Sequence, residues 1–228
     1  MAQRVASSSP VTLKEVKADV RVKTYITGAN DLLNAMGYTE HGHRHAGIVS
    51  TVTKYILSNI GASEREQELG SIAAYLHDIG NVLNRLHPPM IGATMAEDIL
   101  WNLGMPADEI APILGAIGNH EELAGQPISH MSAALIIADK GDVHFSRVQN
   151  PVLETFDIHD RVNYAVQKSR IELDNDKREI ALTLEIDTQA ATVMEYFEIF
   201  LSRMVMCRNA AETLGYRFVL SVNGTLLE

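Results

Sequence analysis

The chain has 228 residues, a formal net charge of −10 and one cysteine, Cys207. This length suits one large domain, with or without a small appendage, and a single thiol excludes both a disulfide framework and a cysteine metal cluster within the chain. The acidic balance argues against a nucleic-acid polymer as partner, because phosphate backbones are bound mainly by clustered Lys and Arg. A metal in this protein would therefore be bound through nitrogen and oxygen.

The first residues are small and rich in serine, so we expect a flexible arm over residues 1–10. The N-terminus lacks the apolar stretch of a signal peptide, and no segment is long and apolar enough to span a bilayer. The sequence thus predicts a soluble, cytoplasmic protein with no membrane partner.

Apolar residues at helical spacing fill most of the chain up to about residue 140. Ser63 and Glu66 form the pattern of a capping box, and Gly37 and Gly61 stand where helices should end. The predicted helices cover residues 13–36, 45–60, 63–80, 88–103, 107–120 and 129–140.

The last third of the chain differs in character. Two segments rich in β-branched residues, 161–173 and 179–186, predict an antiparallel hairpin, and a third strand is expected over 216–222. Between them, residues 188–214 have the pattern of a long amphipathic helix. The predicted fold class is mainly α: a helical metal-binding domain over 11–156, followed by a small α+β region over 157–228.

Histidines and aspartates gather near the ends of the predicted helices. The set is His45, His77, Asp78, His120 and Asp139. In an antiparallel bundle such ends can meet at one level, where facing helices build a metal site. Imidazole and carboxylate ligands suit Mn, Fe, Zn or Mg.

The order of these residues, with His77 and Asp78 in LHDIG and Asp139 in IIADKGD, resembles the HD-domain superfamily of metal-dependent phosphohydrolases. The resemblance covers roughly residues 39–148. It implies that His45, His77, Asp78 and Asp139 hold one divalent metal. His87 and His120 resemble the extra histidines of two-metal members, so we predict two ions, with Mn or Fe favoured and Mg or Zn as alternatives.

Under the two-metal interpretation Asp78 bridges the ions, and a metal-bound hydroxide attacks a phosphoryl group. Asp78 and Lys140 are the predicted catalytic residues. Arg44, Lys140 and Arg147 are predicted to bind substrate phosphate, and Asp142 is expected to orient a ligand histidine. Asn81 stands where cyclic-dinucleotide members usually have Lys, which disfavours cyclic-di-GMP as substrate.

The sequence therefore predicts a phosphohydrolase acting on a small phosphate ester, with a nucleotide as one candidate. Two alternatives stay open: a nucleotide- or metal-sensing module that signals through its tail, and a metal oxygenase on a related scaffold. The Met and aromatic stripe of the last helix predicts either core packing or a homodimer contact. The identity of the substrate is not encoded in any motif.

Overall fold

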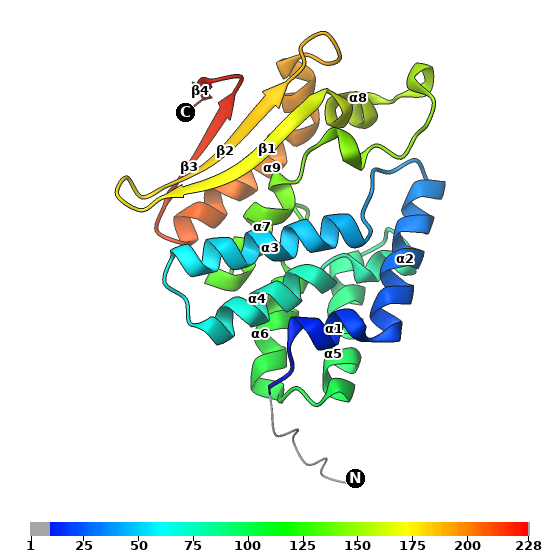
Figure 1. Ribbon diagram of the computed structural model, residues 1–228, viewed down its shortest axis with the longest axis vertical. Helices are drawn as coiled ribbons and strands as arrows, with labels where there is room; N and C mark the ends of the chain where they lie inside the picture. The colour runs from blue at the N-terminus through cyan, green and yellow to red at the C-terminus, as the bar shows by residue number, and fades with distance from the viewer. Residues whose placement is uncertain (1–9, 228) are drawn as a thin grey trace.

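The computed structural model describes residues 10–227, so the predicted arm over 1–10 lies almost wholly outside the described residues. Figure 1 shows a bundle of helices with a small sheet packed at one end. The helices of the bundle are α1 (Leu13–Ala18), α2 (Val20–Ala35), α3 (His43–Asn59), α4 (Glu64–Leu76), α5 (Pro88–Leu103), α6 (Ala107–Gly118) and α7 (His130–Gly141). A short 3₁₀ helix, η1 (Ile79–Val82), follows α4.

The first predicted helix is divided in two at Asp19. The side chain of Asp19 accepts hydrogen bonds from the backbone N–H groups of Arg21 and Val22, which is the geometry of an N-cap. The prediction of one helix over 13–36 was therefore wrong, because apolar spacing continues across the break while the cap starts a new helix. The capping box of Ser63 and Glu66 is confirmed at the start of α4.

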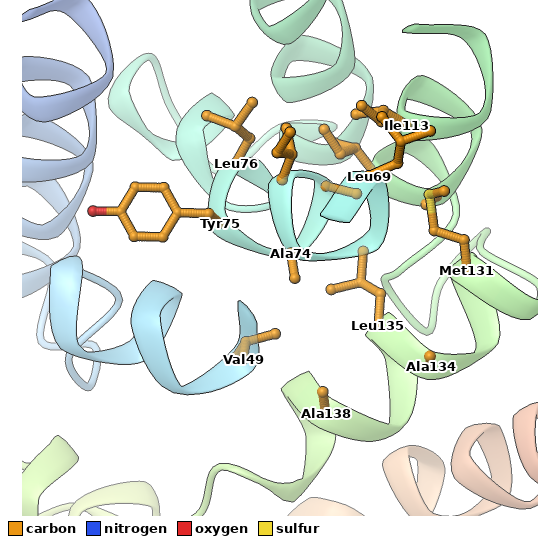
Figure 2. Close-up of a cluster of buried hydrophobic side chains, with 14 of the residues drawn as sticks. Val49, Leu69, Ala74, Tyr75, Leu76, Ile113, Met131, Ala134, Leu135 and Ala138 are labelled. Atoms are coloured by element: carbon orange, nitrogen blue, oxygen red, sulfur yellow. The ribbon is translucent and has the colours of Figure 1, made fainter. Parts of the chain in front are cut away.

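Helix α4 runs through the centre of the bundle. Its residues from Leu69 to Leu76 are all buried. Figure 2 shows Leu69 directed towards Ile113 of α6, while Ala74 faces the side where α3 and α7 contribute Val49 and Leu135. Burial of large aliphatic side chains stabilises a fold by about 1.5–3 kcal/mol each, so this helix fixes the position of whatever follows it. His77 and Asp78 follow it directly.

The C-terminal region is an α+β unit, as predicted, with different boundaries. Residues 161–165, the start of the first predicted strand, belong instead to helix α8 (Ile158–Ala165), because the Asp157 side chain caps its N-terminus. The strands are β1 (Val166–Asp174), β2 (Glu179–Ile186), β3 (Arg217–Val222) and β4 (Thr225–Leu227). Two further 3₁₀ turns, η2 (Phe145–Arg147) and η3 (Leu153–Thr155), precede α8.

The sheet has the order β1-β2-β3-β4, one strand more than predicted. Strands β1 and β2 form the expected antiparallel hairpin, whereas β2 and β3 are parallel and are connected by the long helix α9 (Val193–Thr213). Parallel neighbours need such a crossover. The short β4 pairs antiparallel with β3 and was missed, since three residues after a turn give almost no periodic signal.

Helix α9 joins the sheet to the bundle. Phe200 and Met204 pack with the buried face of the sheet, whereas Met206, Ala210 and Leu214 belong to the main core of the bundle. Part of the predicted apolar stripe is thus core, while Met194 remains exposed. No helix within residues 10–227 combines the length and apolarity needed to cross a membrane.

Gly80, in the motif that follows α4, lies against the backbone of α5. A Cβ atom added there would collide with the carbonyl oxygen of Pro88 and lie 2.5 Å from the backbone nitrogen of Gly92. Only a residue without a side chain allows the turn after His77 and Asp78 to pack so closely on α5.

We predict that Gly80→Ala lowers the free energy of unfolding by about 2–3 kcal/mol, because backbone atoms cannot move aside as a flexible side chain can. Urea denaturation measures the change. Gly47→Ala, in helix α3 with nothing within 4 Å of the added atom, is the matched control and should be neutral or stabilising. If both variants unfold at the same urea concentration, the close contact of Gly80 with the backbone of α5 would be contradicted.

Candidate metal centre

His77 lies at the C-terminal end of α4 and is oriented by that helix. Its Nδ1 donates a hydrogen bond to the carbonyl oxygen of Ala74, 2.7 Å away. A carbonyl only accepts, so Nδ1 carries a proton, and Nε2, which is directed into the site, is the nitrogen that can bind a metal once its own proton is released. The last carbonyl groups of a helix lack partners within it, which makes them free to accept such a bond.

His120, which follows the end of α6, is oriented in the same way. Its Nδ1 donates to the carbonyl oxygen of Ile117 at 2.6 Å, and its side chain is buried. The rings of His77 and His120 are 4.9 Å apart and nearly perpendicular. Two helix ends therefore present two Nε2 atoms to one region.

His45, near the start of α3, is oriented by a carboxylate instead. Its Nδ1 lies 2.7 Å from Oδ2 of Asp142, just after α7, which confirms the prediction that Asp142 orients a histidine. Burial by itself would raise the pKa of Asp142, but the hydrogen bond to His45 and the charge of Arg147 hold that pKa well below its usual range. A histidine bonded in this way to a carboxylate is a common arrangement behind metal ligands.

Four side chains converge on one point. Nε2 of His45 lies 3.3 Å from Nε2 of His77, 3.2 Å from Oδ1 of Asp139 and 3.6 Å from Oδ2 of Asp78. Nε2 of His77 lies 3.2 Å from the same Asp78 oxygen and 3.6 Å from the same Asp139 oxygen. These residues come from three different helices and the turn after one of them.

The spacing suits a single divalent ion. Ligand bonds of about 2.1 Å place neighbouring ligand atoms about 3.0–3.4 Å apart in octahedral or tetrahedral geometry. Oδ2 of Asp78 is moreover buried without a hydrogen-bond partner among the described residues. Because a buried polar atom without a partner is costly, a cation at this point is chemically reasonable.

Asp78 also reaches towards a second position. Its other oxygen, Oδ1, lies 3.9 Å from Nε2 of His120 and accepts a hydrogen bond from the Asn81 side chain at 2.9 Å. His77, Asp78 and His120 form a second group of ligand atoms within 4.8 Å of one another. His77 is the residue that the two groups share, and Asp78 faces both of them, with Oδ2 towards His45 and His77 and Oδ1 towards His120.

His87 is not brought to this site. It is exposed at the start of α5, with a left-handed backbone (φ 56°), and belongs to neither ligand group found among residues 10–227. The sequence predicted that His87 and His120 both bind the second metal, because both resemble extra histidines of the family. The structure separates them, since the Pro88-Pro89 start of α5 holds His87 at the surface.

A polar pocket opens over the ligands. It is lined by His41, Asp78, Arg85, His120, Glu121, Glu122, Leu123, Asp139, Lys140, Arg147 and Arg203. Lys140, predicted as catalytic and substrate-binding, is buried with Nζ 2.9 Å from Oδ2 of Asp139 and 3.1 Å from Oε1 of Glu122. It holds the carboxylate of Asp139 in place.

The two predicted substrate arginines have other partners. Arg147 is buried and donates to the backbone carbonyls of Glu40 and Asp142, which occupies its guanidinium although it borders the pocket. Arg44 pairs with Glu40 and Asp142 and lines a different pocket beside β1. Both therefore support Asp142, which orients His45.

Arg85, Arg203 and Glu122 line the pocket and were missed by sequence reasoning. Glu122 stands two residues after His120, a proximity that offers a weak signal. Arg203 lies on α9, over 60 residues after Asp139, and only the packing of α9 against α7 brings it here.

Comparisons with known proteins give a sequence relative and a similar solved structure. No family model matches the chain. It is 24% identical over 200 residues, 77% of this chain and 76% of the other, to an uncharacterized protein of Methanocaldococcus jannaschii. A solved structure described as a predicted HD superfamily hydrolase, from an uncultured Thermotogales bacterium, is similar over 59% of this chain and 75% of its own, with 22% identity and a TM-score of 0.44.

The pKa values of the site predict a proton exchange on metal binding. Burial disfavours the charged form of His77, but Asp78 and Asp139 outweigh it and raise the pKa of His77 to about 10. Near pH 8 the metal-free protein should therefore release about one proton when the first Mn²⁺ binds, and its affinity should increase as the pH rises towards 10. Titration calorimetry in buffers of different ionisation enthalpy measures the proton count. Binding without proton release would contradict a ligand role for His77.

A pair of histidine variants tests which residues serve the second position. We predict that His120→Ala abolishes binding of a second Mn²⁺ or weakens it about 10- to 100-fold, because Asp78 would lose its histidine partner there. His87→Asn, which tolerates the left-handed backbone, should leave the stoichiometry unchanged. Equilibrium dialysis with metal quantification measures both. If His87→Asn binds one Mn²⁺ fewer than wild type, the prediction from the sequence that His87 is a ligand would be correct.

Proposed function

We propose that this chain is a metal-dependent phosphohydrolase that cleaves a small phosphate ester, with a nucleotide as one candidate substrate. The observation that carries the proposal is the convergence of three imidazole Nε2 atoms and two carboxylates beneath a pocket with cationic side chains. A divalent ion in such a site lowers the pKa of bound water and polarises a phosphoryl oxygen.

The chain's own residues have separate roles in this proposal. His45, His77, Asp78 and Asp139 hold the ion, and His120 with Asp78 would hold a second one. Asp142 and the carbonyl groups of Ala74 and Ile117 keep the three imidazoles in the tautomer that leaves Nε2 free. The protein thus supplies a rigid site and needs no nucleophilic side chain.

Lys140 is a positioning residue rather than one that contacts substrate. Its ammonium group is buried between Asp139 and Glu122. Burial opposes the charge of Lys140, yet the neighbouring carboxylates raise its pKa, so it stays protonated. A fixed cation behind Asp139 keeps one carboxylate oxygen occupied and directs the other towards His45 and His77.

The test is turnover. Protein purified without chelators and supplied with Mn²⁺ or Fe²⁺ should release phosphate from at least one member of a panel of nucleotides and sugar phosphates. Asp78→Ala should reduce the rate at least about 1000-fold, because Oδ2 of Asp78 faces His45 and His77 while Oδ1 faces His120. Asp176→Asn, in the exposed hairpin turn, is the control that should change nothing.

The rival functions predict different outcomes. A sensing module would bind a nucleotide tightly without forming product across several metals. An oxygenase would consume oxygen in the presence of iron and substrate. An active wild-type preparation that proves free of metal would overturn the proposed mechanism.

A further inference from the structure

Two arginines of the pocket are held at its edge by chains of contacts that begin at the metal-ligand candidates. Arg85 lies between η1 and α5, and Arg203 lies on α9. Both side chains are about one third exposed, unlike the buried Lys140 and Arg147 of the same pocket. They are therefore the cations of the pocket that a ligand from solvent can reach.

Arg203 is fixed from two sides. Its Nε lies 3.2 Å from Oε1 of Glu122, and its guanidinium carbon lies 4.7 Å from the ring centre of the buried Phe200. The same Glu122 oxygen contacts Lys140, so one carboxylate is shared by two cations. The two Nη groups of Arg203 have no hydrogen-bond partner among residues 10–227, and they remain free to donate.

Arg85 is fixed in a similar way. Its Nη1 donates to Oδ1 of Asn81 at 2.9 Å and lies 3.5 Å from Glu121, while the Tyr38 ring lies 5.2 Å from its guanidinium carbon. Asn81 in turn donates to Asp78. Asn81 thus connects Arg85 to Asp78. In the sequence, Asn81 was distinguished only because cyclic-dinucleotide members of the family usually have Lys at this position.

The charges of the pocket leave these arginines available to an anion. Asp78 and Asp139 are assigned to the metal, so they do not neutralise an arginine. Glu121 and Glu122 face Arg85, Arg203 and Lys140. The pocket is lined by four cations and four carboxylates: Arg85, Lys140, Arg147 and Arg203, and Asp78, Glu121, Glu122 and Asp139. A bound divalent ion would therefore leave it positive, which favours an anionic group there.

We propose that Arg85 and Arg203 bind the phosphoryl group of a phosphomonoester, so that the site selects monoesters over diesters. This inference rests on the proposed phosphohydrolase function. A monoester phosphoryl group has three non-bridging oxygens and nearly two negative charges at neutral pH. With one oxygen facing the metal-ligand candidates, two oxygens remain for two arginines. A diester has one oxygen fewer and a single charge.

The experiment compares a dianionic and a monoanionic probe. Calorimetry in Mn²⁺ measures the affinity of inorganic phosphate and of dimethyl phosphate for wild type, Arg85→Ala, Arg203→Ala and Arg208→Ala. Arg208 is an exposed arginine of the same helix α9 outside the pocket, which makes it the matched control. The Mn²⁺ stoichiometry of each variant is measured in parallel.

We expect phosphate to bind wild type more tightly than dimethyl phosphate. Arg85→Ala and Arg203→Ala should each weaken phosphate binding about 10- to 100-fold, the loss typical of a charge-assisted hydrogen bond, and weaken dimethyl phosphate binding much less. Arg208→Ala should change neither, and all variants should keep the wild-type amount of Mn²⁺. If Arg203→Ala does not fold, Arg203→Lys keeps the charge without the planar fork and should give an intermediate loss.

Unchanged phosphate affinity in the Arg85 and Arg203 variants, or an equal loss for both probes, would overturn the inference. The proposed function fails separately: if wild type binds phosphate through these arginines but hydrolyses no ester on the panel, the anion site stands without the hydrolase. If the protein hydrolyses monoesters but the two arginine variants bind phosphate as tightly as wild type, only the assignment of Arg85 and Arg203 is rejected.

Discussion

Two carboxylates and three imidazoles lie in two overlapping groups, each with its ligand atoms within 4.8 Å of one another, and the surrounding structure keeps them there. Asp78 and Asp139 both keep pKa values well below the usual range, although burial alone would raise them, because His77 and Lys140 supply positive charge. Negative charges gathered in a protein interior need a cation. A bound metal ion would meet that requirement more completely than a proton on His77.

The backbone contributes as much as the side chains to this arrangement. Helices α4 and α6 end beside the site, and each uses a carbonyl of its last turn to hold the Nδ1 proton of the histidine that follows. Gly80 then lets the chain turn tightly against α5. Ligand direction is therefore determined by where helices stop, which is fixed in turn by the buried packing of α4 (Figure 2).

The C-terminal region is part of the site rather than a separate appendage. Helix α9 is the crossover between two parallel strands, and it also packs on α7, the helix that carries Asp139 in its last turn. The contacts of Arg203 with Glu122, of Glu122 with Lys140 and of Lys140 with Asp139 connect this tail to the candidate metal centre. A rearrangement of the sheet would therefore move a wall of the pocket.

The sequence alone predicted the helical bundle, most helix positions and the hairpin, because apolar periodicity and caps are local. It also predicted that His45, His77, Asp78, His120 and Asp139 gather, and the structure brings them together because each stands at or near the end of a helix. It could not exclude His87, whose position depends on a left-handed residue before two prolines. It also could not divide the first helix, where a single cap competes with continuous periodicity. Arg85 and Arg203 emerged only from the tertiary structure, because the approach of distant segments to a common pocket leaves no pattern in the order of residues.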